Sequence, residues 1–347
     1  MNLKELAQML ELSQTTVSRA LNGYPEVSEA TRRRVLSAAQ TYDYRPNPRA
    51  KGLATGQAMA IAHIIPMTSR DEIVNPIFAD FVAGAGEVYT ARGYDMMLTF
   101  AADDKDAAAL RDLVRKGSAD GAIVHAPRID ESLLGRLNEA GLPFVVHGRS
   151  SDHEAGYSWV DMDNRRAFAR ATDFLLDLGH RRIGLINGPE GMDFAHRRRG
   201  GYEDSLRARG LSPDPELRSH GVMTEGYGYR SAETLLALAE PPTAILASSL
   251  ISALGVRRAI EDAGLRMGQD VSVISHDDDL SYLRNGEESP IFTTTRSSVR
   301  DAGRKSAEML LRLIDDPALP PQTCLLPAAL TVGGSTGPSP ALRQLEA

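Results

Sequence analysis

Cysteine is nearly absent from this chain, which has Cys324 as its single thiol in 347 residues. One thiol excludes an internal disulfide, and neither it nor the histidines have the spacing of metal ligands. The sequence also lacks an apolar run close to the roughly 18 residues that mark a membrane span. Its N-terminus lacks the basic start, apolar core and small-residue cleavage site of a signal peptide. We therefore expect a cytoplasmic protein that contains no membrane segment and no metal or cofactor.

The charge is unevenly distributed along the sequence. The formal net charge is −7, which by itself argues against a nucleic-acid partner. Residues 1–57, however, carry eight basic and five acidic side chains, so this segment has a net charge of +3 and the rest of the chain −10. A small basic head on an acidic body is typical of a polyanion-binding module attached to another domain. At this length, with 42% hydrophobic residues, two or three domains are expected.

Three short helical patterns occupy the first 45 residues. Asn2 and Glu5 match a capping box before the first pattern. Ser13 and Ser28 can cap the second and third, and Gly23 predicts the end of the second. Apolar residues at helical spacing predict the inward face, which is formed by Leu3, Leu6, Ala7, Leu10, Val17, Ala20, Leu21, Val35, Leu36 and Ala39. Three such helices with a tight turn between the first two indicate a helix-turn-helix unit.

The remainder of the chain has a different pattern. The stretch "YRPNPRAKGLATG" contains two prolines that interrupt the helical pattern, as is typical of a linker. Beyond it, helical stretches that end in glycine alternate with apolar runs of strand length: "AMAIAHIIP", "YDMMLTFA", "GAIVHA", "PFVVHG", "RIGLING", "TAILAS" and "VSVISH". This alternation predicts parallel sheets covered by helices on both faces. Nearly 280 residues are too many for one sheet, so we expect two α/β lobes with a cleft between them.

Several motifs carry a resemblance to a known family. They are "LKELAQMLELSQTTVSRALNG", "VSEATRRRVLSAAQTYDYRPNPRAKGLATG", "NPIFADF", "LGHRRIGLINGP", "RRRGGY" and "VSVISHDDD". Over residues 2 to about 335 the chain resembles the lac repressor family of bacterial transcription regulators. Within that family it looks most like alpha-proteobacterial regulators of α-glucoside utilisation, on the motifs "FVVHGR", "YSWVDMDN" and "MTEGYGYR".

The resemblance implies a domain organisation. A helix-turn-helix head at residues 1–45 is followed by a hinge at 46–57, an effector-binding and dimerisation domain at 58–335 and a tail at 336–347. The large domain resembles a periplasmic sugar-binding protein, with two parallel-sheet lobes joined by three crossovers. We assign the N-terminal lobe to about 58–160 plus 291–318, and the C-terminal lobe to about 161–290 plus 319–335.

The second helix of the head has the features of a recognition helix. Gln14, Thr15 and Arg19 project outward, and donors and acceptors near the start of such a helix reach base edges in the major groove. By resemblance, Gln14 and Thr15 are the main base-reading pair and Arg19 is the family's arginine. The family's phosphate-contacting positions fall on Thr16, Ser18 and Asn22. Without the linker motif, a protein-interaction domain with an exposed polar helix face would explain this helix equally well.

The linker has its own implied role in DNA binding. Family members form a hinge helix that inserts a leucine into the minor groove, and by position Leu53 is that leucine, with Asn47 and Ala50 beside it. Inserting an apolar side chain between base pairs unstacks a base step, which costs about a few kcal/mol. Additional protein contacts with the bent duplex offset this cost. Gly52 stands within this segment, and a glycine inside a helix lowers the stability of the helix by roughly 0.5 to 1 kcal/mol relative to alanine. A flexible tether is the alternative explanation of this segment.

The resemblance also implies an effector site between the lobes. Arg198 matches an arginine that binds ligand hydroxyls, and Asp277 matches an aspartate that faces it, a pairing suited to a polyhydroxylated ligand. The other implied cleft residues are Asn75, Phe78, His147, Phe194, Ser249 and Ser297. The alternatives are a solvated charge run for Arg198, a turn cap for Asp277 and core packing for Phe194. Gly148 and Ser249 replace residues that relatives often carry, so the binding set is rearranged.

Other classes of protein fit less well. "GGSTG" matches a nucleophile elbow around Ser335, but no histidine follows the serine and no helix is predicted after it, so we do not expect an enzyme. A sugar-binding protein without a DNA role would need export, and the head stands where a signal peptide would be. The sequence therefore predicts a homodimeric repressor that an α-glucoside disaccharide releases from operator DNA. A purine corepressor and a sugar-phosphate effector remain as alternatives.

Overall fold

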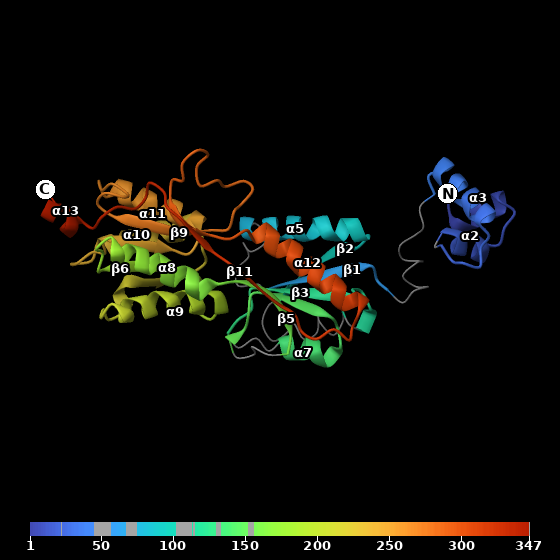
Figure 1. The fold of residues 1–347 in the computed structure, drawn as a ribbon, viewed down its shortest axis with the longest axis horizontal. Helices are drawn as coiled ribbons and strands as arrows, with labels where there is room; N and C mark the ends of the chain where they lie inside the picture. The colour runs from blue at the N-terminus through green and yellow to red at the C-terminus, as the bar shows by residue number, and fades with distance from the viewer. Residues whose placement is uncertain are drawn as a thin grey trace. The chain divides into compact units, whose positions relative to one another are not determined.

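The computed structural model describes residues 1–21, 23–44, 57–66, 75–101, 113, 115–129, 133–151 and 156–346. The chain divides into two compact units, residues 1–59 and 60–347 (Figure 1). The first unit is all helical, and the second is an α/β body that contains two six-stranded sheets. This confirms the predicted fold class. Among the described helices, none is long and apolar enough to cross a membrane.

Three helices form the head: α1 (Leu3–Met9), α2 (Gln14–Leu21) and α3 (Glu29–Thr41). The predicted caps are confirmed, because the Asn2 side chain and Glu5 form a capping box and the Ser28 side chain accepts a hydrogen bond from a backbone N–H of α3. The Ser13 hydroxyl likewise accepts one from the backbone N–H of Thr16 at 3.0 Å. These side chains satisfy backbone donors that the first turn of a helix leaves without partners.

The head has a small apolar core around Leu6, Val17 and Val35, all of which are fully buried. The prediction for Leu36 is wrong, since its side chain is 46% exposed. Val35 and Ala39 are four residues apart and share the buried face of α3, whereas Leu36 is turned by about 100° from Val35 around the helix. The core residues nevertheless hold α2 with Gln14, Thr15 and Arg19 exposed on its opposite side.

The sheet of the N-terminal lobe has the strand order β11-β5-β4-β3-β1-β2, with every neighbouring pair parallel. Its strands are β1 (Ala60–Pro66), β2 (Asp95–Ala101), β3 (Gly121–His125), β4 (Phe144–His147), β5 (Ser158–Met162) and β11 (Thr323–Leu326). Helices α5 (Pro76–Arg92) and α12 (Val299–Asp315) cover one face of the sheet, and α7 (Leu133–Ala140) covers the other.

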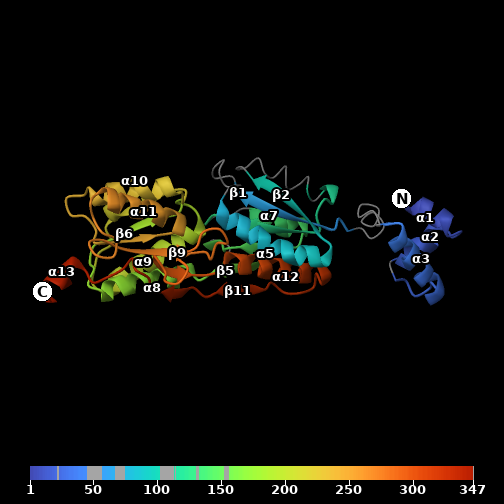
Figure 2. The same cartoon turned by 90° about the horizontal axis from the view of Figure 1, so that it is seen from above.

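Helices α5 and α12 lie side by side on this sheet (Figures 1 and 2). Gly84 and Gly303 allow the close approach, because a Cβ at Gly84 would overlap the carbonyl oxygen of Arg300 and one at Gly303 would overlap that of Phe81. The contact joins the middle of α5, which begins after Asn75, to the first turns of α12.

The sheet of the C-terminal lobe has the order β12-β10-β9-β8-β6-β7, in which only the β10–β12 pair is antiparallel. Its strands are β6 (Ile183–Asn187), β7 (Arg218–His220), β8 (Ala244–Ala247), β9 (Ser272–Asp277), β10 (Thr293–Arg296) and β12 (Ala329–Thr331). Its faces are covered by α8 (Asn164–Asp177) with α9 (Asp193–Ala208), and by α10 (Glu225–Leu236) with α11 (Leu250–Asp262). A short 3-10 turn (Pro215–Leu217) precedes β7, and α13 (Pro340–Glu346) is the last helix.

The chain passes between the two sheets three times: after β5, after β10 and after β11. Two strands therefore lie in the other lobe from the one we expected. Thr293–Arg296 pairs with β9 in the C-terminal lobe, and Thr323–Leu326 pairs with β5 in the N-terminal lobe. Short polar strands such as "TTTR" carry no continuous apolar run, so the sequence pattern did not reveal which sheet they complete.

Candidate functional site

A cavity of about 330 Å³ lies between the two lobes of the body. From the N-terminal lobe it is lined by the start of α5 and by His125 and His147 at the ends of β3 and β4. From the C-terminal lobe it is lined by α9 and by the segment that follows β9. The carboxyl ends of parallel strands, where ligands bind in α/β folds, thus form the cavity from both sides.

Most of the predicted effector residues line this cavity: Asn75, Phe78, His147, Phe194, Arg198 and Ser297. Two predicted residues do not. Ser249 is buried at the start of α11, where its hydroxyl accepts a hydrogen bond from the backbone N–H of Ser252 at 3.2 Å. Asp277 is buried as well, and its Oδ1 accepts one from the backbone N–H of Asp279 at 2.8 Å.

The neighbouring residue, Asp278, lines the cavity in place of Asp277. Its Oδ1 lies 3.3 Å from Nε2 of His276, which also lines the cavity. Asp277 therefore caps a turn, which was the alternative to a ligand-binding role for this residue. Asp278 occupies the position at the cavity that the family resemblance implied for Asp277. Successive side chains of a strand point to opposite faces, so an offset of one residue decides which carboxylate a ligand meets.

Two hydrogen bonds and two aromatic rings hold Arg198 in one orientation. Its Nε donates a hydrogen bond to Oδ1 of Asn164 at 2.7 Å, and its Nη1 donates to the carbonyl of Ser248 at 2.6 Å. Its Cζ lies 5.0 Å from the ring centre of Phe194 and 5.1 Å from that of Phe168. Burial lowers the pKa of Arg198 to about 10, so the side chain is still charged at neutral pH. It is not part of a solvated charge run.

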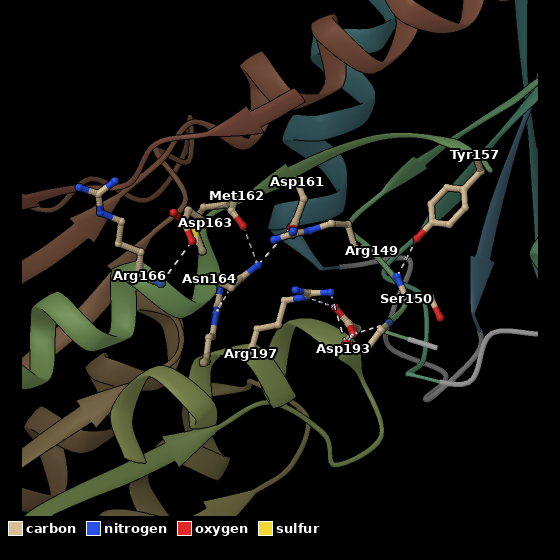
Figure 3. Close-up of polar contacts among 12 residues, drawn as sticks. Arg149, Ser150, Tyr157, Asp161, Met162, Asp163, Asn164, Arg166, Asp193 and Arg197 are labelled. Carbon is tan, nitrogen blue, oxygen red and sulfur yellow. Dashed lines mark hydrogen bonds and ion pairs between the residues drawn. The ribbon is translucent and has the colours of Figure 1, made fainter. Parts of the chain in front are cut away.

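A hydrogen-bonded network continues from Asn164, the partner of Arg198, to the N-terminal lobe. Its contacts are drawn in Figure 3. Nδ2 of Asn164 donates to Oδ1 of Asp161 and to the carbonyl of Met162, both at 3.1 Å. Nε of Arg149 donates to Oδ2 of Asp161 at 2.8 Å. Burial raises the pKa of Asp161, and the charge of Arg149 opposes that shift. The positive charge of Arg149 at the cavity is therefore balanced by a carboxylate.

Histidines form the facing wall in the N-terminal lobe. His63 of β1 and His125 of β3 are hydrogen-bonded through Nδ1 and Nε2 at 3.0 Å. The ring of Phe81 lies 4.6 Å from that of His125 and 4.3 Å from that of His147, centre to centre. Burial lowers the pKa of His63 to about 3 and that of His147 to about 4, and it also lowers the pKa of His125. This wall is uncharged at neutral pH.

Sequence reasoning identified His147 but missed His125 and His63. His125 had a usable signal, because it ends the apolar run "GAIVH" just as His147 ends "FVVH", and the two residues pair in neighbouring strands. His63 had none, since it interrupts the run "AIAHIIP" in the middle of a strand.

The head places its predicted DNA-contacting residues on one side of α2. Gln14, Thr15 and Arg19 are exposed, and Thr16 and Ser18 are partly exposed, while Val17 and Ala20 are buried. Asn22, Asn47, Ala50 and Leu53 lie outside the described residues.

The serine of "GGSTG" is a structural residue. Ser335 is fully buried, its hydroxyl donates a hydrogen bond to the carbonyl of Val273, and it accepts one from the backbone N–H of Thr293 at 2.8 Å. His180 of "LGHRRI" is buried nearby, bonded to Thr243 at 2.8 Å and to Ser272 at 3.0 Å. The serine connects β9 to β10 and cannot reach a substrate.

Comparisons with known proteins agree with this architecture. Residues 2–47 match the family of bacterial regulatory proteins of the lacI type, and residues 172–336 match the periplasmic binding protein-like domain. The chain is 44% identical over 340 residues to the HTH-type transcriptional regulator AglR of Rhizobium meliloti (strain 1021), covering 98% of this chain and 95% of AglR. It is 30% identical over 331 residues to the regulator CelR of Thermobifida fusca, covering 95% and 96%.

A solved structure of the CelR–cellobiose complex has a TM-score of 0.72 at 29% identity and covers 96% of this chain and 99% of that one. A helix-turn-helix head followed by a two-lobed body with a cavity at the strand ends defines the class of ligand-responsive DNA-binding regulators. The chain belongs to the LacI family of bacterial regulatory proteins. Like its relatives it is a transcriptional regulator and not an enzyme.

Proposed function

We propose that this protein is a homodimeric repressor of carbohydrate-utilisation genes that acts in the cytoplasm and leaves its operator when a small neutral sugar binds. The observation that carries the proposal is the cavity between the lobes, where the fixed guanidinium of Arg198 and the carboxylate of Asp278 stand opposite a wall of neutral histidines. Bidentate donors and carboxylates suit hydroxyl groups, and aromatic rings suit the apolar faces of a sugar.

The charges at the cavity support an uncharged ligand. Arg149 is paired with Asp161, and Asp278 and Glu225 also line the cavity. A sugar phosphate brings about two negative charges at neutral pH and needs, besides Arg198, a second cation that is not already paired with a carboxylate. The cavity residues therefore favour an unphosphorylated sugar over a sugar phosphate.

The relatives support the class of ligand. CelR is solved as a complex with cellobiose, and a LacI family regulator from Enterococcus faecium, 26% identical over 80% of this chain and 99% of that chain with a TM-score of 0.66, is solved with ribose. The resemblance of "FVVHGR", "YSWVDMDN" and "MTEGYGYR" to α-glucoside regulators leads us to propose an α-glucoside disaccharide such as maltose, sucrose or trehalose.

The DNA side of the proposal rests on the exposed face of α2. Gln14, Thr15 and Arg19 read base edges, Thr16, Ser18 and Asn22 contact phosphates, and Leu53, flanked by Asn47 and Ala50, enters the minor groove. Two heads of a dimer read a pseudo-palindromic operator. Ligand binding closes the cleft, shifts the population of body conformations and lowers operator affinity.

Calorimetry with maltose and cellobiose tests the effector. The two sugars differ only in the configuration of the glycosidic bond, so cellobiose is the matched control. We expect maltose, sucrose or trehalose to bind more tightly than cellobiose and to release operator DNA in an electrophoretic shift assay at fixed salt. Tight binding of a purine or a sugar phosphate with no response to any α-glucoside would overturn the effector assignment. Ligand that strengthens the operator complex would reverse the sign of the mechanism.

A further inference from the structure

A buried chain of hydrogen bonds leads from helix α5 to the cavity. The Tyr89 hydroxyl lies 3.2 Å from Nε2 of His63, and Nδ1 of His63 lies 3.0 Å from Nε2 of His125. His63 is fully buried, Tyr89 is 1% exposed, and His125 lines the cavity. These hydrogen bonds therefore connect Tyr89, which does not line the cavity, to His125, which does.

The direction of the protons along this chain follows from Tyr89. Burial raises the pKa of its hydroxyl, so the hydroxyl keeps its proton. Within the described part of the chain, His63 is the only hydrogen-bond partner of that hydroxyl. A buried donor without an acceptor is costly, so Tyr89 donates to Nε2 of His63.

The position of the proton on His63 then determines the position of the proton on His125. A neutral histidine has one protonated and one bare ring nitrogen, so His63, with a bare Nε2, carries its proton on Nδ1. Nδ1 of His63 donates to Nε2 of His125, which leaves the proton of His125 on Nδ1. A doubly protonated His125 is excluded by the same contact, because its Nε2–H would face the Nδ1–H of His63.

From this geometry we infer that Tyr89 and His63 fix His125 as a neutral N–H donor toward the effector cavity, so that the ligand must present a hydrogen-bond acceptor there. Among the described residues, Nδ1 of His125 has no hydrogen-bond partner, and the ring belongs to the cavity lining. A sugar hydroxyl or ether oxygen meets the requirement, and an ammonium group does not. The ligand class rests on the proposed function, whereas the proton arrangement does not. Tyr89 and His63 act as positioning residues.

Nitrogen NMR of the full-length, histidine-labelled protein without ligand tests the arrangement directly, with signals assigned from single His→Gln variants. At pH 7 we expect His63 and His125 each to be neutral and protonated on Nδ1. A proton on Nε2 of His125, or a charged His125, would overturn the inference. This measurement on the wild type decides the matter even where a variant does not fold.

Tyr89→Phe removes the donor that orients the chain while keeping the ring. We expect His125 to lose its fixed Nδ1 proton and maltose affinity to fall about tenfold, the effect of one hydrogen bond. Tyr202→Phe is the matched control, because Tyr202 is also fully buried but donates to the carbonyl of Ile183 in the C-terminal lobe at 2.8 Å. It should change neither the histidine signals nor the affinity.

The two proposals fail in different ways. If no sugar binds while both histidines carry the expected Nδ1 protons, the effector assignment is wrong and the proton arrangement stands. If maltose binds equally well to wild type and to Tyr89→Phe, and the histidine signals do not change in the variant, the positioning role of Tyr89 is wrong and the sugar assignment stands.

Discussion

The carboxylate of Asp80 accepts two hydrogen bonds from Ser281, one from its backbone N–H at 2.8 Å and one from its hydroxyl at 2.5 Å. Asp80 belongs to α5 of the N-terminal lobe, and Ser281 belongs to the segment that follows β9 of the C-terminal lobe. Leu280 packs into the core of the N-terminal lobe beside this contact. The segment that carries the cavity residue Asp278 is therefore attached to the opposite lobe.

Asp80→Ala should weaken this attachment more than Ser281→Ala does. The first removes the acceptor of both hydrogen bonds, and the second leaves the backbone bond in place. Hydrogen bonds to charged groups contribute about 1.5 to 3 kcal/mol each, so we expect the free energy of unfolding to fall by about 3 to 6 kcal/mol for Asp80→Ala, which removes two bonds, and by about 1.5 to 3 kcal/mol for Ser281→Ala, which removes one. Urea denaturation measures both. Equal losses would show that the hydroxyl bond alone matters.

Asp278→Asn should lower maltose affinity, and Asp277→Asn should not. Asp278 lines the cavity, whereas the Asp277 side chain accepts a bond from a backbone N–H that an asparagine oxygen can also accept. A lost charged hydrogen bond corresponds to about ten- to hundredfold in affinity. Calorimetry on the pair separates the two neighbours. A larger loss of maltose affinity for Asp277→Asn would show that Asp277, as the family resemblance implies, is the carboxylate that binds the ligand.

Gln14→Ala and Arg19→Ala should weaken operator binding and leave maltose binding unchanged. A bidentate base contact is worth about 1 to 3 kcal/mol, and losing it relaxes base preference as well as affinity. Arg33→Ala, which removes one positive charge from the exposed side of α3, is the control for general electrostatic attraction. Electrophoretic shifts on an operator library at one salt concentration measure both quantities. Unchanged selectivity in both α2 variants would contradict the assignment of α2 as the recognition helix.

Stability should decrease as the pH falls from about 7.5 to 5.5. Burial lowers the pKa of His63 to about 3 and that of His147 to about 4, so the unfolded chain binds protons in this range that the folded chain does not. At pH 5.5, one unit below the ordinary value of about 6.5, each such histidine lowers the free energy of unfolding by about 1.4 kcal/mol. Urea denaturation at several pH values measures the slope.

Variants identify the histidines responsible for that slope. His147→Gln should remove the part of the pH slope that one histidine contributes. Burial raises the pKa of Asp161 and that of Asp277, so these two carboxyl groups increase the free energy of unfolding as the pH falls. Their effect occurs at a lower pH, nearer the range in which carboxyl groups ordinarily titrate. A stability that rises on acidification through this range would contradict the neutral state of the histidine wall.

The sequence predicted those features that depend on local chemistry. Ser13 and Ser28 cap helices wherever their neighbours permit, and strands buried on both faces, such as Ile183–Asn187, are continuous apolar runs. It did not predict features that depend on pairing between distant segments. Thr293–Arg296 is recognisable as a strand of the C-terminal lobe only once β9 lies beside it.

The same division holds at the cavity. Arg198 and Phe194, which are four residues apart on α9, were both predicted, but the ring of Phe168 that also packs on Arg198 comes from α8, which only the fold brings beside α9. The bond between His63 and His125 joins residues 62 positions apart, and nothing local to either one indicates it.

The antiparallel strand β12 and the parallel strand β11 are the last strands of the chain, and each completes the edge of a different sheet. During synthesis on the ribosome, β5 and β10 therefore remain unpaired along one side until almost the whole body has emerged. Unpaired strand edges invite association with other chains. Neither lobe can finish folding while the other is still being made, so both sheets keep an open edge until residues 323–331 have been synthesised, and the two sheets then close within a few residues of each other.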